Sequence, residues 1–539
     1  MTCVVHGNST APVHCSRRPD WTRCLFARCF LTLTVGWALQ FLPAEVAAEI
    51  LTVVETSCLR LAVSSDARVV EFVDRQSGEN CVAGEGGPCA WVRKANRMLP
   101  ATSAALVDGQ WHVRFGDSGM EAVLRVTAQA RHLTWEVVSL SDEDIDEFVF
   151  CDVPLKLQGV PAEPFAATAL ALNLKTHVAE LPRAASRLRA ACYPKFGCVG
   201  AAVAIVATPA ADMRAALQEA VSAAPELPHS PLGGPWALDA HLNRGSYLFD
   251  HAGITEAEVD EWIALARSLG MTQIDFHNGS SIRFGDFRPN PVRYPQGRAS
   301  LRAVIDRLHA AGIVAGLHTY AFFIAKDCPW VTPVPDPRLA SDATFTLPAT
   351  LTATSDAIAV SESTENMSAV TGFFVRNSVT LRIDNELITY TGVRTEPPYG
   401  FTGCQRGAYG TQAAAHATGA QVHHLKECFG LFVPDPDTTL LTEIADATAD
   451  TFNECGFDMI YFDALDGEDI LGGAEWGWHY GSRFVFEVWQ RLKKPALVEM
   501  STFHHHLWYV RSRIWAWDHP TRSHKRFVDL HVADNADNR

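Results

Sequence analysis

Ionisable side chains stand at the ends of several short apolar segments in the second half of the chain. These residues are Asp239, Asp275 with His277, His318 with Tyr320, Asp463, Glu499 and Asp518. Cleavage of a glycosidic bond needs two carboxyl groups, because one attacks the anomeric carbon or activates water while the other protonates the leaving oxygen. The residue types therefore indicate acid–base and nucleophilic chemistry, provided that the fold gathers them at one edge.

Asp463 and Asp518 have the strongest local case among these carboxylates. Asp463 follows Met459-Ile-Tyr-Phe, a strand apolar enough to be buried on both faces and to hold the carboxylate rigidly. Asp518 follows Trp515-Ala-Trp517, and flanking indoles raise a carboxyl pKa by desolvation, as a general acid requires. Each also has a structural interpretation, since a strand-end aspartate caps turns and Asp518 precedes His519-Pro520.

A repeated order of strand, loop and helix positions these residues. Strands are expected at 235–239, 271–276, 313–320, 458–463, 496–500 and 513–518, and helices at 255–269, 299–311, 437–455 and 480–492. Such alternation predicts parallel βα units and favours a (β/α)₈ barrel, whose active site lies at the carboxyl ends of its strands. No Gly-x-Gly-x-x-Gly follows the first strand, which weighs against a dinucleotide fold. Six strands rather than eight are found, so the barrel is expected to be C-terminally truncated.

The rest of the chain predicts a multidomain protein. Alternation at period two from about 50 to 157 indicates an antiparallel β-sandwich, and a Pro/Gly cluster at 225–235 marks a boundary. A long Thr/Ala/Val-rich interruption indicates a small inserted β-domain, whose role (gating, carbohydrate binding or spacing) stays open. The predicted parts are a signal peptide at 1–48, a β-sandwich at 49–225, a first part of the barrel at 234–340, the insert at 341–426 and a second part of the barrel at 427–539.

The N-terminus and the composition bear on location and partners. Basic residues between 17 and 28, an apolar run and then small residues predict a secretory signal cleaved after Ala48, with an uncleaved signal anchor as the alternative. The protein is thus expected to be secreted or periplasmic, and no later run is long enough to span a membrane. A net charge of −16 argues against nucleic acid and anionic membranes as partners.

Cysteines and histidines give no metal pattern. The pairs Cys81/Cys89 and Cys192/Cys198 either close small disulfide loops in an oxidising compartment or are free and buried. No Cys/His set has zinc spacing, the run from His504 to His506 is interpreted as a loop, and no metal or other cofactor is expected.

Three segments resemble the retaining α-galactosidase and α-glucosidase superfamily (glycoside hydrolase families 27, 31 and 36). Gly456-Phe-Asp-Met-Ile-Tyr-Phe-Asp463 is similar to its nucleophile strand, Arg511-Ser-Arg-Ile-Trp-Ala-Trp-Asp518 to its acid/base segment, and Ala310 to His318 to its third strand. The resemblance implies that Asp463 is the nucleophile and Asp518 the acid/base. It implies sugar contacts from the other strand-end residues, namely Asp239, Asp275, His277, His318, Tyr320, Glu499, Arg513 and Trp517.

These features predict a retaining, exo-acting α-glycosidase that acts on an oligosaccharide or polysaccharide outside the cytoplasm. An endo-acting hydrolase or a transglycosylase on the same scaffold is an alternative, because fold does not determine outcome. A non-catalytic carbohydrate-binding surface protein is a third. The sugar, its linkage and the oligomeric state stay open.

Overall fold

The computed structural model describes residues 49–160, 162–277 and 279–513. The expected signal peptide, Trp517 and Asp518 lie outside the described residues, as does most of the expected sixth strand.

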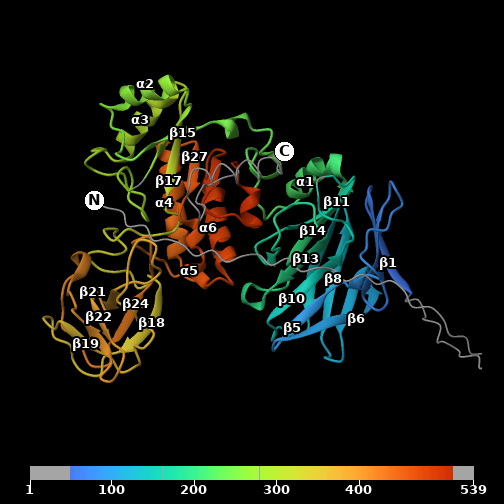
Figure 1. Cartoon of the computed structure of the whole chain (residues 1–539), viewed down its shortest axis with the longest axis horizontal. Coiled ribbons are helices and arrows are strands. Elements are labelled where there is room, and N and C mark those ends of the chain that lie inside the picture. Colours follow the sequence, from blue (N-terminus) through green and yellow to red (C-terminus); the bar gives the residue numbers. More distant parts are fainter. Residues whose placement is uncertain (1–48, 161, 278, 514–539) are drawn as a thin grey trace, which may run out of the picture. The chain divides into compact units, whose positions relative to one another are not determined.

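The first part of the described chain is built from antiparallel strands (Figure 1). A four-stranded sheet has the order β1 (Ile50–Glu55), β2 (Leu59–Ser64), β3 (Arg68–Asp74) and β4 (Gly87–Pro88). A ten-stranded sheet has the order β11 (Phe165–Ala171), β14 (Ala202–Pro209), β9 (His132–Leu140), β8 (Glu121–Ala128), β7 (Gln110–Phe115), β6 (Arg97–Val107), β5 (Trp91–Lys94), β10 (Glu147–Pro154), β13 (Arg187–Cys192) and β12 (Thr176–His177). Both sheets contribute to one apolar core, in which Trp111 and Trp135 meet edge to face at 4.9 Å. The antiparallel prediction for this part of the chain is confirmed.

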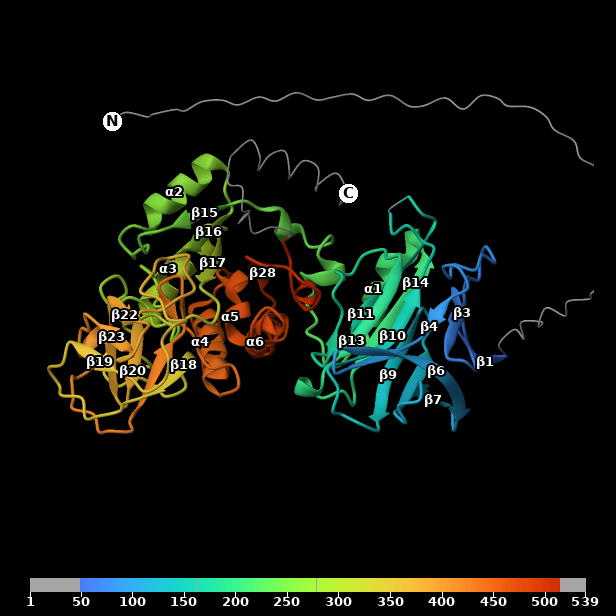
Figure 2. The ribbon, with the colours of Figure 1, turned by 60° about the horizontal axis from the view of Figure 1, so that its bottom comes forward.

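The second part contains a five-stranded parallel sheet (Figure 2). Its order is β15 (Tyr247–Asp250), β16 (Gln273–Phe276), β17 (Val314–Thr319), β27 (Met459–Phe462) and β28 (Leu497–Met500). Alternate residues such as Ile274, Leu317 and Ile460 pack against the helices, while Met459, Tyr461 and Leu497 form a separate cluster on the other face. The predicted parallel sheet is therefore present, with five strands in the described residues.

Amphipathic helices connect these strands. They are α2 (Val259–Leu269), α3 (Arg298–Ala310), α4 (Leu440–Cys455) and α6 (Gly477–Arg491), with the short α5 (Asp469–Gly472) before α6. Gly270 and Gly456 end α2 and α4 in left-handed conformations (φ 69° and 84°), which glycine adopts without steric cost. Neighbouring helices α2–α3, α3–α4 and α4–α6 pack against one another. Among the described residues, no helix combines the length and apolar character that a membrane span needs.

The expected first strand at 235–239 is wrong. Gly234–Trp236 forms a short 3-10 helix, and the first parallel strand is β15, about ten residues later. Pro235 lacks the amide hydrogen that a ladder needs. Gly233 and Gly234 lie against the backbone of residues 509–511, where a Cβ on Gly233 would come within 2.5 Å of the Val510 carbonyl oxygen. The Pro/Gly cluster therefore continues to Trp236 as a connection, preceded by helix α1 (Met213–Ser222).

The segment between β17 and α4 contains two further antiparallel sheets (Figure 1). The first has the order β18 (Ser341–Thr346), β24 (Gln421–Leu425), β20 (Thr380–Ile383) and β21 (Glu386–Thr389), and the second β19 (Ala357–Ala359), β23 (Gly400–Thr402) and β22 (Gly392–Arg394). Side chains such as Phe345, Leu381 and Phe401 form their own apolar core. The hairpin of β25 (Glu427–Cys428) and β26 (Leu431–Phe432) then returns the chain to α4. We call residues 341–425 the insert.

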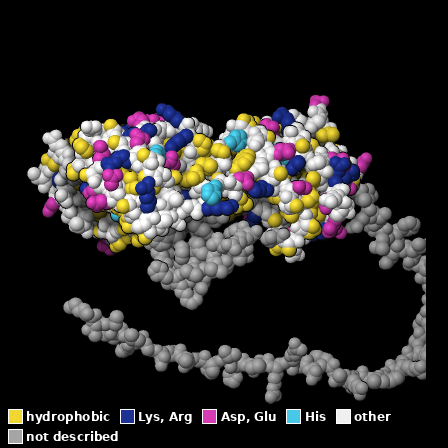
Figure 3. All heavy atoms as spheres, turned by 90° about the horizontal axis from the view of Figure 1, so that it is seen from above, with side chains coloured by type: hydrophobic (Ala, Val, Ile, Leu, Met, Phe, Trp, Pro, Cys, Tyr) yellow, Lys and Arg dark blue, Asp and Glu magenta, His cyan; other side chains and the backbone are white. Residues whose placement is uncertain are grey.

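The ten described cysteines are all free, and nine of them are buried. Cys81, Cys89, Cys192 and Cys198 are among the buried ones. The structure therefore has free, buried cysteines at these positions rather than disulfide loops. On the face in Figure 3, basic and acidic side chains are interspersed.

Candidate active site

The register of the parallel sheet brings one row of polar residues together at its carboxyl end. His318 pairs with Tyr461, and Tyr461 with Glu499. Extending the ladders of β15, β16 and β17 by one residue places His251 and His277 in the same row. Such rows of inward side chains are typical of parallel barrels, where the carboxyl ends carry the chemistry.

Asp463 lies one residue beyond the end of β27, above this row. Its Oδ2 is 3.1 Å from His318 Nε2, and its Oδ1 accepts a 2.8 Å hydrogen bond from the amide of Ala464. The Asp463 side chain is 18% exposed, whereas that of His318 is fully buried. Ala464 has a φ of 60°, so the chain turns sharply after the carboxylate. His318 and the Ala464 amide thus fix the Asp463 carboxylate, and part of its surface stays accessible.

His277 and His318, beneath Asp463, are neutral at pH 7. Burial, together with the neighbouring imidazoles, lowers the pKa of His277 to about 3, and burial lowers the pKa of His318 to about 3. The rings of His277 and His318 are 3.7 Å apart between centroids. Because a carboxylate only accepts hydrogen bonds, the proton of a neutral His318 is assigned to Nε2, which donates to Asp463.

Asp463 lines a cavity of about 270 Å³. The wall combines aromatic side chains from several elements with a few polar groups: Phe249, His251, His277, Tyr320, Phe373, Phe374, Phe429, Tyr461, Asp463, Ala464 and Asp466. Concave sites with a largely apolar wall and a few convergent polar groups are the usual form of small-molecule sites. Of the predicted residues, Asp463, His277 and Tyr320 therefore line one cavity, and His318 contacts Asp463 from beneath.

Asp275 lies one row lower, fully buried. Gln273 donates a 2.5 Å hydrogen bond from Nε2 to its Oδ1, and burial raises the pKa of Asp275 to about 7. Gly316 makes room for this carboxyl group, because a Cβ at Gly316 would lie 2.0 Å from Asp275 Oδ1. Asp275 is not part of the cavity wall.

Glu499 belongs to the row but is also covered. Tyr247 donates a 2.8 Å hydrogen bond to its Oε1, and Arg513 Nη1 is 3.8 Å from its Oε2. Burial raises the pKa of Glu499 to about 7. Arg513 also donates to Gln273 at 2.6 Å and so links Glu499 to the Asp275 group. Two carboxyl groups with raised pKa values therefore lie beneath the site, a feature common where proton transfer is organised.

We expect Gly316→Ala to lower the free energy of unfolding by about 1–3 kcal/mol, since overpacking displaces the buried Asp275 carboxyl group. Gly279→Ala is the matched control, because its new Cβ would meet only ordinary contacts at 3.7 Å or more. Urea denaturation of both variants measures the difference. Adding Asp275→Ala to Gly316→Ala is expected to recover part of the loss, and equal stability of the two glycine variants would refute the packing argument.

Asp239 is not brought to this site. Its side chain is 60% exposed and forms an ion pair with Arg214 of α1. The segment that precedes Asp239 is a 3-10 helix rather than a strand, so Asp239 does not lie at a strand end. The true first strand β15 leads instead to His251, which sequence reasoning missed, and Asp250 at its end is structural, accepting the amides of Ala252, Gly253 and Ile254.

The consecutive histidines after β28 point to different partners. His504 faces Glu468 at 3.2 Å. His505 Nε2 accepts the amide of Ala171 in β11 at 3.0 Å, and His506 Nε2 is 3.3 Å from the Asn173 carbonyl oxygen. Burial lowers the pKa of His505 to about 3, so it is neutral. The run connects this loop to the ten-stranded sheet.

Comparison with known proteins identifies structural likeness only. No family model and no curated protein match the chain. A family 36 α-galactosidase from Geobacillus stearothermophilus, solved with raffinose, has 10% identity and a TM-score of 0.44 over 86% of this chain and 74% of its own. An α-galactosidase from Lactobacillus brevis has 9% identity and a TM-score of 0.43 over 89% and 74%. One from Thermus thermophilus, solved with stachyose, has 13% identity and a TM-score of 0.30 over 84% and 71%. The chain is structurally similar over most of its length to α-galactosidases of family 36.

Proposed function

We propose that this protein is an exported, retaining glycoside hydrolase that removes a terminal α-linked sugar. The observation that carries the proposal is the placement of Asp463. Its carboxylate lines a cavity at the carboxyl end of a parallel sheet, with Oδ2 on His318 and Oδ1 on the Ala464 amide. Export rests on the basic, apolar and small-residue order of the first 48 residues.

In the proposed reaction, Asp463 attacks the anomeric carbon as the bond to the leaving oxygen breaks. The hydrogen bond from His318 fixes the direction of the carboxylate, so the attacking oxygen is presented in one orientation. Asp518 is proposed to protonate the leaving oxygen and then to deprotonate the water that hydrolyses the glycosyl-enzyme. Retention requires the two carboxyl groups to stand about 5–5.5 Å apart.

The size of the cavity supports action at a chain end. Its volume of about 270 Å³ is at or below the low end of small-molecule sites, which suits one sugar ring with a small leaving group better than an extended chain. The polar row of His251 and His277 and the carboxylates Asp463 and Asp466 offer hydrogen bonds to hydroxyl groups, and Phe249 and Tyr461 offer apolar surface to a ring face.

A panel of p-nitrophenyl α- and β-glycosides tests the proposal on the full chain. We expect hydrolysis of one or a few α-glycosides, and ¹H NMR of the first turnovers is expected to show the α-anomer of the free sugar. An initial β-anomer would replace retention with inversion. Hydrolysis of internal bonds of a polysaccharide, without release of terminal sugar, would contradict exo action.

A further inference from the structure

One loop of the insert reaches the cavity that contains Asp463. Phe373 and Phe374 of this loop line the cavity together with Phe429, the tip of the β25–β26 hairpin. Phe373 is 49% exposed and Phe374 is 68% exposed, so the two neighbouring rings form an exposed apolar patch. The two rings meet edge to face at 4.9 Å, and Phe373 lies 5.6 Å from Phe429. We call Phe373, Phe374 and Phe429 the aromatic wall.

The loop is held in place by polar contacts on both sides of the two phenylalanines. Asn377 Nδ2 donates to the carbonyl oxygens of Ser368 and Val370 at 3.0 and 2.8 Å, which closes the base of the loop. Arg376 forms an ion pair with Asp469 and donates to the Asp466 carbonyl oxygen at 3.3 Å. Asp466 and Asp469 follow β27, so the insert is connected to the segment that carries Asp463.

Aromatic contacts continue from the wall toward the reacting end. Phe429 lies 6.2 Å from Tyr320, and Tyr320 lies 5.6 Å from His318, the partner of Asp463. Gly467 makes room for Phe429, since a Cβ there would come within 3.1 Å of its ring. The cavity is therefore polar at its Asp463 and histidine end and apolar at its insert end.

We propose that the aromatic wall binds the leaving group, and that this group is apolar, so the substrates are aryl or alkyl α-glycosides. The proposal rests on the proposed function. The three phenylalanine rings offer no hydrogen-bond partner. A second sugar would therefore gain only stacking against them, whereas a phenyl or alkyl group buries its whole apolar surface without giving up hydrogen bonds to water. The glycosidic oxygen leaves with its apolar substituent as a phenol or an alcohol, after taking a proton from the acid/base carboxyl group.

The test compares two leaving groups on the same sugar. The substrates are the p-nitrophenyl α-glycoside that the wild-type protein hydrolyses fastest and the corresponding α-glycosyl fluoride, whose leaving group is too small to contact the wall. For Phe373→Ala/Phe374→Ala, the ratio of kcat/KM for the aryl glycoside to that for the fluoride is expected to fall about tenfold, the effect of losing part of two apolar contacts. Val370→Ala is the matched control, because Val370 is 66% exposed on the same loop and does not line the cavity.

An unchanged ratio in Phe373→Ala/Phe374→Ala overturns the proposal, as does a preference of the wild type for a disaccharide over the aryl glycoside. If the wild type hydrolyses no glycoside, the proposed function has failed, and the wall is judged by binding alone. Isothermal titration with octyl α-glucoside below its micelle concentration is then the readout. Binding by the wild type and by Val370→Ala, but not by Phe373→Ala/Phe374→Ala, supports an apolar site, and equal binding by all three excludes it.

Discussion

Replacement of Asp463 by asparagine is expected to lower kcat on a p-nitrophenyl α-glycoside by at least about 10³-fold, the scale seen when a group acting on the reacting bond is removed. Asparagine fills nearly the same space and can still accept a hydrogen bond from His318, so the fold and the cavity are retained. An amide does not form the glycosyl-enzyme. The measurement is steady-state kinetics, with near-ultraviolet circular dichroism to verify the fold.

Asp466→Asn is the matched control for this substitution. Asp466 lines the same cavity three residues later, and its Oδ1 accepts a 2.9 Å hydrogen bond from Ser501. We expect a loss of less than about tenfold, because asparagine keeps the oxygen that accepts from Ser501 and Asp466 takes no part in the proposed bond cleavage. Azide added to Asp463→Gly is expected to restore turnover and to yield a β-glycosyl azide. Equal kcat for the wild type and Asp463→Asn would remove Asp463 from the mechanism.

The sequence predicted the elements that carry Asp463 because their patterns are regular. Buried strands such as Met459–Phe462 are continuous apolar runs, and helices such as α4 carry an apolar face and end at a glycine. The four parallel strands β16, β17, β27 and β28 therefore fall within their predicted ranges. β15 was missed because it follows a Pro/Gly cluster whose end, at 235–239, resembles a strand.

The composition of the site was less predictable than its scaffold. His251, His277 and His318 share a row only because of the ladder register, and a shift of one residue would turn each side chain to the other face. Phe373 and Phe374 belong to an insert whose own pattern predicts a separate core, and no local signal shows that its loop lines a cavity elsewhere. Long-range placement of this kind needs the tertiary structure.

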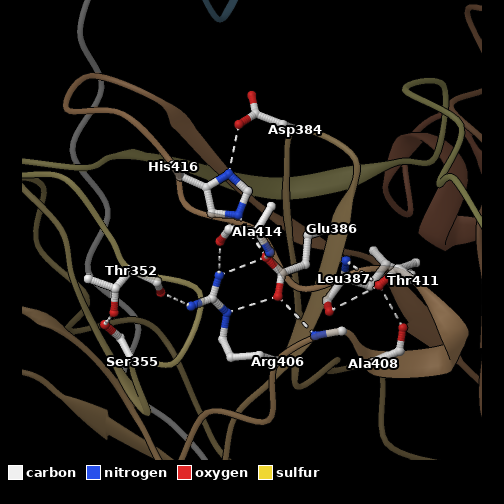
Figure 4. A network of polar contacts seen from close by, with 11 residues as sticks. Thr352, Ser355, Asp384, Glu386, Leu387, Arg406, Ala408, Thr411, Ala414 and His416 are labelled. Carbon is white, nitrogen blue, oxygen red and sulfur yellow. Dashed lines mark hydrogen bonds and ion pairs between the residues drawn. The ribbon is translucent and has the colours of Figure 1, made fainter.

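A buried ion pair lies within the insert, and its removal is expected to destabilise the insert strongly. Glu386 on β21 has a side chain that is 1% exposed, and Arg406, its partner, is 7% exposed (Figure 4). Arg406 Nε and Nη2 donate to the two carboxylate oxygens at 2.8 and 2.7 Å. The amides of Gly407 and Ala414 and His416 Nε2 add contacts at 2.9, 3.1 and 2.8 Å. The carboxylate therefore joins β21 to two other segments of the insert, 406–407 and 414–416.

The same contacts determine how Glu386 responds to pH. Burial alone raises its pKa, but the hydrogen bonds from Arg406, His416 and the two amides outweigh burial, and the pKa lies below its ordinary value. The unfolded chain then binds a proton at higher pH than the folded chain does. The stabilisation is complete above the ordinary glutamate pKa and is lost as the pH falls through the lowered, folded pKa.

We expect Glu386→Gln to destabilise the insert by about 3–5 kcal/mol at pH 7, because Arg406 is left buried without a counter-charge. Hydrogen exchange read by mass spectrometry is the measurement, since it reports loss of protection in β20, β21 and β24 separately from the parallel sheet. Glu362→Gln is the control. Glu362 lies in the same insert and accepts bonds from Thr346 N and Oγ1 at 2.7 and 2.8 Å, without a buried ion pair. A loss below about 1 kcal/mol is expected there.

Removal of both charges distinguishes the ion pair from simple packing. Glu386→Gln combined with Arg406→Met is expected to be more stable than Glu386→Gln alone, since no charge then remains buried. If the double variant loses the sum of the two single losses, the charge argument fails. Phe373 and Phe374 belong to a loop of the insert. Glu386→Gln is therefore also expected to lower the ratio of aryl glycoside turnover to glycosyl fluoride turnover at temperatures where the insert unfolds. If hydrogen exchange shows that the insert has unfolded and the ratio is unchanged, the position of the Phe373–Phe374 loop does not depend on the folded insert.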